Sequence, residues 1–174
     1  HMQQHTAQHL LTAVAADRFG WATSAFHLGP DTCDIELAAA ALPAEPLRRL
    51  EEDVAAEIRA ARPVTQRRVR KEEMATLPVR TRGLPDGHEG DVRLVEIAGV
   101  DLNTCGGTHL RSTAEIEVLK LLGTEKMRGG TRLFFVAGGR VRRRLGAQEE
   151  RVGCLRALLG APDAGLVEAV EAKL

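Results

Sequence analysis

The sequence predicts an α+β domain followed by a short helical tail. Apolar residues recur at helical spacing over Thr6–Phe19 and over Pro43–Arg62, which indicates two helices. The segments between and after these helices are shorter and alternate apolar with polar residues, as strands do. From Arg140 onward the apolar spacing becomes loosely helical again. We therefore expect one domain over residues 1–139 and a helical tail over residues 140–174.

The first helix is expected to be largely buried. Its apolar residues recur at spacings of one, three and four, and charges interrupt it only near its end; they are Leu10, Leu11, Val14, Ala15 and Phe19. Gly20 is expected to end this helix, because glycine readily adopts the left-handed conformation that follows many last helical turns.

A β-hairpin is expected to follow over Trp21–Leu37, turning at Gly29-Pro30-Asp31. Side chains of a strand point alternately to its two faces. Cys33, Ile35 and Leu37 should therefore share the buried face of the second strand.

The second helix is expected to be amphipathic and to lie on the surface, with one apolar stripe formed by Leu47, Leu50, Val54 and Ile58. Pro63 should end it, because the residue before a proline avoids helical geometry. Weak alternation over Val64–Arg70 then predicts an edge strand.

Three further segments complete the expected domain. Val92–Val100 and Arg132–Ala137 have strand character, and Glu115–Leu122 is expected to be a strand or a short helix. Gly129-Gly130 is expected to turn the chain before the last strand. The tail that follows has too little apolar mass for a core of its own, so we expect it to dock on the domain or to form a homodimer.

The composition is that of an ordinary globular protein and does not select a partner. The 174 residues contain 24 basic and 24 acidic side chains, so net charge does not indicate a nucleic-acid partner. An odd cysteine count of three, with no leader-like segment and no long apolar run, argues against secretion and membrane insertion. We expect a cytoplasmic protein whose free thiols are available as metal ligands.

Two pairs of residues have the spacing of metal ligands. His5 and His9 are four residues apart at the start of a predicted helix, which places both imidazoles on one face. Cys105 and His109 repeat this spacing around Gly106-Gly107, where the backbone can bend tightly. One thiolate and three imidazoles complete a tetrahedral set, so we expect these four residues to bind one Zn²⁺ ion.

Two familiar classes of zinc enzyme do not fit this set. The helical motif of zinc proteases needs a glutamate directly after the first histidine, and this position is Thr6. Zinc deaminases need a His-x-Glu and a Cys-x-x-Cys pair, and neither is present.

The two pairs also resemble a known signature. His5-Thr6-Ala7-Gln8-His9-Leu10-Leu11 and Cys105-Gly106-Gly107-Thr108-His109-Leu110 are similar to the paired motifs of the alanyl-tRNA synthetase editing domain and its free-standing relatives. The similarity extends to Asp91-Val92-Arg93-Leu94-Val95 and to Gly130-Thr131-Arg132-Leu133, and so covers about residues 3–139. Threonyl-type editing domains usually end the second motif in Gly-Pro-His, so Gly-Thr-His favours the alanyl branch.

This resemblance implies a two-layer fold in which an antiparallel sheet wraps around a central helix, with zinc in the cleft between them. It implies hydrolysis of the ester that links serine, or glycine, to the 3′-terminal adenosine of alanine tRNA. The matching positions imply that His5, His9, Cys105 and His109 are the zinc ligands. The alternatives are a non-catalytic zinc module that binds RNA or protein, and a related hydrolase for another aminoacyl ester.

Zinc with four protein ligands has the coordination of a structural site, so we expect the metal to anchor substrate rather than to drive hydrolysis alone. The amides of Gly106 and Gly107 are candidate oxyanion donors. Gln8 and Thr108 are candidates to hold water or substrate. A hydroxyl partner for serine is expected from Gln8 or from Thr32, which lies in a segment that the resemblance aligns only loosely with the amino-acid pocket.

Two basic stretches are candidate contacts for tRNA phosphates. The first consists of Arg62, Arg67, Arg68, Arg70, Lys71, Arg80 and Arg82, and the second of Arg140, Arg142, Arg143 and Arg144. Both stretches are also compatible with solvated surfaces. The chain lacks the aminoacylation domain of the synthetase, whereas its tail is similar to the start of the helical segment that follows the editing domain there. We therefore expect that it could be a fragment of a longer protein.

Overall fold

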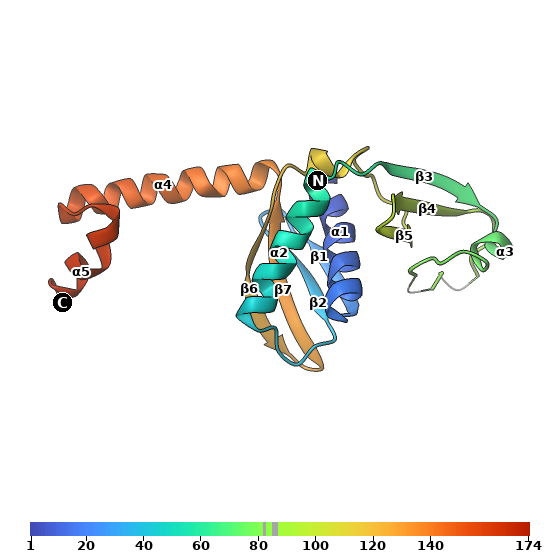
Figure 1. Ribbon diagram of the computed structural model, residues 1–174, viewed down its shortest axis with the longest axis horizontal. Coiled ribbons are helices and arrows are strands. Elements are labelled where there is room, and N and C mark those ends of the chain that lie inside the picture. Colours follow the sequence, from blue (N-terminus) through green and yellow to red (C-terminus); the bar gives the residue numbers. More distant parts are fainter. Residues whose placement is uncertain (82, 85–86) are drawn as a thin grey trace. The chain divides into compact units, whose positions relative to one another are not determined.

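The computed structural model describes residues 1–81, 83–84 and 87–174 and divides into two compact units, residues 1–138 and 139–174 (Figure 1). It confirms the α+β class. The helices of the first unit are α1 (Met2–Phe19), α2 (Ala44–Arg59), α3 (Lys71–Met74) and the 3₁₀ turn η1 (Thr113–Ile116). Its strands are β1 (Thr23–Leu28), β2 (Cys33–Leu37), β3 (Val64–Val69), β4 (Val92–Ile97), β5 (Asp101–Thr104), β6 (Leu119–Met127) and β7 (Gly130–Ala137).

Helix α1 is the buried centre of the first unit. Every residue from Gln4 to Leu11 is buried, polar side chains included, because α1 contacts strands of both sheets and helix α2. Gly20 ends the helix with φ 68°, and its N–H donates to the carbonyl of Ala16, as predicted.

The side chain of Gln4 fixes α1 to the four-stranded sheet. Its amide nitrogen donates to the carbonyl of Ala137 over 2.7 Å, and its amide oxygen accepts from the N–H of Ala137 over 3.0 Å. The carbonyl and the N–H of Ala137, at the end of β7, are therefore both paired by one buried side chain.

The first sheet is antiparallel and has the strand order β1-β2-β7-β6. The predicted hairpin forms β1 and β2, and Cys33, Ile35 and Leu37 share its buried face as expected. The segment that we expected to be a strand or a short helix contains both, because η1 ends at Ile116 and β6 begins at Leu119.

The remaining strands form a separate antiparallel sheet of order β3-β4-β5, so the strands are divided between two sheets. Strand β3 lies at its edge, as predicted. Strand β5 was missed by the pattern, because it has only four residues and begins with Asp101. The chain turns at Gly99, with φ 71°, and β5 then returns along β4 and places Cys105 at its end.

Helix α2 packs against α1 through the predicted stripe, since Leu50, Val54 and Ile58 are buried. Glu57 on the same helix is also buried, and its carboxylate is paired on both sides. It accepts from Arg18 of α1 over 2.6 Å and from Arg62 at the start of the next segment. A buried carboxylate needs such partners, so this triad joins α1 and α2 by charge as well as by packing.

The second unit consists of α4 (Gly139–Leu159), the 3₁₀ turn η2 (Asp163–Gly165) and α5 (Leu166–Glu171). Helix α4 has 21 residues, and neither Gly146 nor Gly153 interrupts it. Both helices expose large apolar side chains, among them Leu145, Leu158 and Val167. Homodimer formation through this unit stays a prediction. Across the described ranges, every helix is too short or too polar to be a candidate bilayer span.

Candidate metal centre and adjoining cavity

The four predicted ligands converge on one point. His5 and His9 lie on one face of α1, and Cys105 and His109 lie in the loop after β5. The Sγ atom of Cys105 is 3.4 Å from Nε2 of His5 and 3.3 Å from Nε2 of His109. One potential ligand atom from each of the four residues lies within 4.8 Å of all the others. Residues about a hundred positions apart therefore form a single cluster.

Two of the separations between donor atoms match a tetrahedral zinc site. Bonds of about 2.0–2.3 Å from zinc to nitrogen and sulfur require neighbouring donor atoms to be about 3.3–3.8 Å apart. The two measured sulfur–nitrogen distances fall in this range. The donor set of one thiolate and three imidazoles is also one that zinc prefers.

Arg93 and Gly107 shape the loop that carries Cys105. Arg93 of β4 donates through Nη1 to the carbonyls of Cys105 and Gly107, each over 2.6 Å, and through Nη2 to Gln66. Gly107 lies against the imidazole of His5, where a Cβ atom would be 2.6 Å from Nδ1. A side chain at this position would displace the ring, so only glycine fits.

Two side chains contact the Nδ1 atoms of His9 and His109, on the sides of the rings that face away from the cluster. Nδ1 of His9 is 3.2 Å from the carboxylate of Asp101, which is buried at the start of β5. Nδ1 of His109 is 3.2 Å from the hydroxyl of Thr6, and this hydroxyl also accepts from the N–H of Leu110. Such partners fix the ring orientation of metal-binding histidines and leave Nε2 for the metal.

The electrostatics of the cluster favour a thiolate at Cys105. Burial alone would raise the pKa of this thiol, but hydrogen bonds from His109, His5 and His9 and from the N–H of Gly107 lower the pKa to about 3. Burial would lower the pKa of His9, but hydrogen bonds with Asp101 and Cys105 outweigh it and raise the pKa to about 9. Burial and the nearby charges of His9 and His5 lower the pKa of His109. The metal-free cluster thus pairs a thiolate with the His9 imidazolium, which must lose a proton when a metal binds.

We expect the Asp101→Asn variant to lower the pKa of His9 from about 9 towards 6.5, because the carboxylate that stabilises the imidazolium is removed. Zinc affinity should fall about 10- to 100-fold, as for other partners that orient metal-binding histidines. In the wild type, the raised pKa of His9 means that its imidazolium stabilises the folded state. This contribution to the free energy of unfolding is fully present below about pH 6.5 and is lost as the pH rises through about 9. Titration of the His9 ring by NMR in the metal-free protein measures the shift.

Asp17→Asn is the matched control. Asp17 accepts from Arg80 over 2.5 Å, and Arg80 in turn pairs with Asp101 over 3.2 Å. Removal of the Asp17 carboxylate disturbs the same ionic network without touching His9. An unchanged His9 titration in Asp101→Asn, or an equal shift in both variants, would contradict the role of Asp101.

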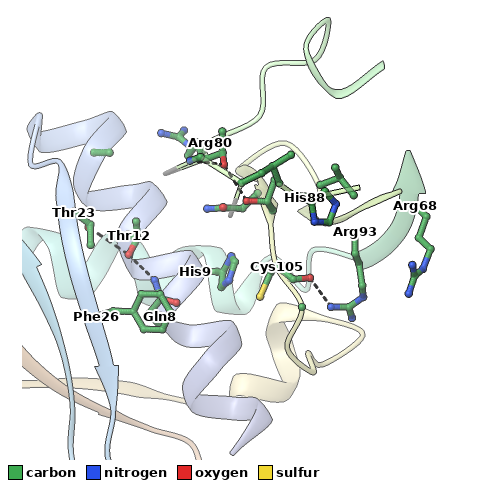
Figure 2. Close-up of a pocket in the computed structure, with 18 of the residues that line it drawn as sticks. Gln8, His9, Thr12, Thr23, Phe26, Arg68, Arg80, His88, Arg93 and Cys105 are labelled. Carbon is green, nitrogen blue, oxygen red and sulfur yellow. Dashed lines mark hydrogen bonds between the residues drawn. The ribbon is translucent and has the colours of Figure 1, made fainter. Parts of the chain in front are cut away.

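A cavity of about 820 Å³ opens beside the cluster, and His9, Cys105 and Gly106 form part of its wall (Figure 2). On one side the wall contains Gln8 and Thr12 of α1 together with Thr23 and Phe26 of β1. The amide nitrogen of Gln8 donates to Thr12 over 3.0 Å. Its amide oxygen is buried and has no hydrogen-bond partner among the described residues.

The structure brings some of the predicted substrate-binding residues to this cavity and leaves others away from it. Gln8 and Gly106 line it. The N–H of Gly107 donates to the Cys105 sulfur over 3.4 Å, so it is engaged with a ligand. Thr108 is exposed, and neither Thr108 nor Thr32 lines the cavity. The threonine that contacts Gln8 is instead Thr12, whose hydroxyl also accepts from Thr23.

The first basic stretch separates into residues with different environments. Arg62 pairs with Glu57, and Arg67 lies 3.7 Å from Glu73. Arg68 and Arg80 line the cavity. The predicted tRNA contact Arg82 lies outside the described residues, as does Pro85 of the loop before β4.

Two histidines have neighbours that their spacing in the sequence does not indicate. His27 is exposed, but it lies 2.8 Å from the carboxylate of Asp34. His88 lines the cavity. Strand register explains the first, because His27 and Asp34 are direct cross-strand neighbours. His88 lies in an irregular segment, where the spacing of residues does not indicate which way a side chain points.

The chain is similar in sequence to proteins that are named for alanyl-tRNA editing. Residues 92–134 match the family model of the threonyl and alanyl tRNA synthetase second additional domain. The chain is 42% identical over 173 residues to the alanyl-tRNA editing protein Aarsd1 of Rattus norvegicus, which covers 99% of this chain and 41% of the relative. It is 44% identical over 142 residues to the Danio rerio Aarsd1 protein, which covers 81% of this chain and 34% of the relative.

The similarity also reaches a synthetase. The alanine–tRNA ligase of Sulfurisphaera tokodaii is 33% identical over 159 residues, which is 87% of this chain and 17% of the ligase. The chain thus spans only part of each of these proteins. The match to the rat protein, over 99% of the chain, is long enough to take in both halves of the candidate metal centre. By sequence, the chain is similar to the alanyl-tRNA editing proteins, and its residues 92–134 match the second additional domain of threonyl- and alanyl-tRNA synthetases.

Proposed function

We propose that the chain is an aminoacyl-tRNA deacylase that chiefly hydrolyses the ester of serine on alanine tRNA, with glycine as a poorer second substrate because it lacks the hydroxyl, and that it acts in the cytoplasm. The observation that carries the proposal is the ligand cluster in the wall of a cavity that also contains an unpartnered buried amide oxygen. Relatives named alanyl-tRNA editing proteins support the reaction and the tRNA. The chain spans 34–41% of their lengths, so the activity of the whole protein is part of the proposal.

We further propose Zn²⁺ as the metal, held by His5, His9, Cys105 and His109. The donor atoms and their separations fit zinc, as described above. When bound, zinc would supply a fixed positive charge that anchors the substrate close to its ester group. Because the four protein donors complete the usual tetrahedral set, the residues of the cavity must contribute the selectivity.

Gln8 is suited to recognise the serine hydroxyl. Its side chain is 4% exposed, and its amide nitrogen is already used by Thr12, so the free acceptor is held in one orientation. A hydroxyl donor would satisfy this oxygen, whereas an alanine methyl group would leave it buried and unpaired. The site should therefore hydrolyse the seryl ester and spare the alanyl ester.

The loop of the metal cluster is suited to the ester itself. Gly106 lines the cavity directly after Cys105, and Arg93 holds the carbonyls on either side of it. Its backbone can approach a carbonyl group without interference from a side chain, since no atom lies within 4 Å of its Cβ position. We assign to its amide the stabilisation of the oxyanion that forms when water attacks the ester, with the 3′-hydroxyl of the tRNA as leaving group.

A deacylation assay tests this function. We expect the purified protein to release serine from seryl-tRNA(Ala) at least about 100-fold faster than alanine from alanyl-tRNA(Ala), since a site built around a hydroxyl rejects a substrate that lacks it. Release of labelled amino acid against time measures both rates. Gln8→Leu removes the acceptor at similar volume and should lower the ratio of the two rates, mainly through the seryl ester.

Each alternative has its own outcome. A zinc-loaded protein that binds tRNA but releases no amino acid above the rate in buffer would support a non-catalytic module. Turnover of another aminoacyl-tRNA in preference to seryl-tRNA(Ala) would support a hydrolase with a different substrate. Either result would overturn the proposed specificity.

A further inference from the structure

A chain of four ionisable side chains leads from the protein surface to the metal cluster. Asp17 of α1 accepts from Nη2 of Arg80 over 2.5 Å. Nε of Arg80 lies 3.2 Å from Oδ1 of Asp101, and Oδ2 of the same carboxylate lies 3.2 Å from Nδ1 of His9. Arg80 therefore connects the carboxylate that orients a predicted ligand to the helix that carries this ligand.

The backbone holds Arg80 close to Asp101 on β5. The N–H of Arg80 donates to the carbonyl of Leu102 over 2.7 Å, and Arg80 forms an isolated parallel bridge with Asn103. These contacts join Arg80 to the two residues that follow Asp101 in the strand. The position of the guanidinium beside the carboxylate therefore does not depend on its side chain alone.

The carboxylate of Asp101 can orient the His9 ring only if it is itself held in place. Within the described ranges, Asp101 forms ion pairs with His9 and Arg80 and with no other side chain. Its side chain is 2% exposed, so its charge is poorly solvated and needs such partners. Oδ1 of Asp101 has no hydrogen-bond partner in those ranges, so Arg80 acts on it through charge.

The charge of Arg80 is already used inside the fold. Its place in a basic stretch made Arg80 a candidate contact for a tRNA phosphate, and it does line the cavity (Figure 2). Two carboxylates, those of Asp17 and Asp101, contact its guanidinium. A phosphate at this position would therefore meet two negative charges beside one positive charge, which is unfavourable. The surroundings of Arg80 fit a role within the protein better than a contact with phosphate.

We propose that Arg80 is a positioning residue of the metal centre. It holds the Asp101 carboxylate in the orientation in which Oδ2 faces Nδ1 of His9, and this contact leaves Nε2 of the ring for the metal. Asp17 holds the outer end of the guanidinium. The proposal rests on the proposed Zn²⁺ ion, and it does not depend on which amino acid the protein releases.

The zinc affinity of Arg80 variants tests this role without any hydrolysis. The metal-free full chain is titrated with Zn²⁺ in competition with a metal-binding dye. Arg80→Gln should weaken zinc binding about 10-fold, the lower end of the range for residues that support metal-bound histidines. Arg80→Lys keeps the positive charge and should restore the affinity to within about threefold of the wild type, because Arg80 acts on Oδ1 through charge.

A double-mutant cycle separates positioning from a general effect on the fold. If Arg80 acts through Asp101, Arg80→Gln should change the zinc affinity of the Asp101→Asn variant by less than about twofold. A general structural effect would instead weaken zinc binding by the same factor in both backgrounds. Equal factors would therefore overturn the proposal.

Arg18→Gln is the matched control for Arg80→Gln. The side chain of Arg18 is 41% exposed and that of Arg80 is 37% exposed, but Arg18 pairs with Asp53 and Glu57 of α2 rather than with Asp101. Arg18→Gln should keep the zinc affinity of the wild type. An equal loss in both variants, or no loss in Arg80→Gln, would refute the role of Arg80.

The outcomes for Arg80 and for the proposed function are distinguishable. A wild type that binds zinc and releases serine, with unchanged zinc affinity in Arg80→Gln, refutes the positioning role alone. Zinc binding that depends on Arg80, in a wild type that releases no amino acid, refutes the proposed hydrolysis alone. A wild type that binds no zinc overturns both the metal centre and the role of Arg80.

Discussion

The Cys105→Ala variant should lose most of the proposed zinc binding and the proposed deacylase activity together. Cys105 supplies the thiolate of the cluster, with its sulfur 3.4 Å from His5 and 3.3 Å from His109. Structural zinc sites are worth about 10–16 kcal/mol for four ligands, so one ligand accounts for about 3 kcal/mol and about a 100-fold loss of affinity. Metal content after dialysis against a weak chelator, measured beside seryl-tRNA(Ala) turnover, gives both quantities.

In the presence of zinc, the variant should also be less stable than the wild type, because a metal that binds only the folded state raises the free energy of unfolding. Cys154→Ala is the control. Cys154 is exposed on α4, in the second compact unit, and lies outside the ligand cluster. Full metal content in Cys105→Ala would remove Cys105 from the ligand set, and metal loss in both variants would point to a general effect of thiol removal.

Gly107→Ala should weaken zinc binding at least about 10-fold, the lower range found when the support of a metal-bound histidine is lost. The added Cβ would be 2.6 Å from Nδ1 of the His5 ring, so the ring or the loop must move. Neither can move freely, because His5 is buried on α1 and Arg93 holds the loop carbonyls. A competition titration with a metal-binding dye measures the loss.

Gly106→Ala makes this test specific. Both glycines have negative φ values, so alanine at either position causes no backbone strain of its own. The Cβ position of Gly106 has no atom within 4 Å, and this variant should keep the zinc affinity of the wild type. The steric explanation would be wrong if the two variants bound zinc equally well.

Local sequence patterns predicted the elements that carry the ligands. The burial of the second half of α1 follows from its apolar residues, and Gly20 ends the helix as expected. The spacing of four residues in each ligand pair is a local property, since a helix and a glycine-bent loop both bring such residues together. The prediction that the two pairs converge depended on their ligand chemistry and on the resemblance, because no local pattern indicates that distant segments meet.

Local patterns failed where a residue's role depends on a neighbour from another element. Asp101 reads as an ordinary polar residue after a strand, but β5 returns along β4 and places its carboxylate beside His9. Thr12 reads as part of a buried helix, and only the position of β1 brings Thr23 to it. Thr32 was as good a candidate as Gln8 for binding the serine hydroxyl when only the sequence was considered, but it does not line the cavity.

The sequence by itself determined the α+β class, the helix that supplies His5 and His9, the glycine-rich loop that supplies Cys105 and His109, and the similarity to alanyl-tRNA editing proteins. Tertiary structure alone decided the division into two sheets, the position of the Asp101 carboxylate beside His9 and the set of residues that line the cavity. The physical reason is the range of the forces involved. Periodicity and ligand spacing follow from the geometry of a few consecutive residues, whereas side-chain partners across a cavity are set by packing between elements far apart in the chain.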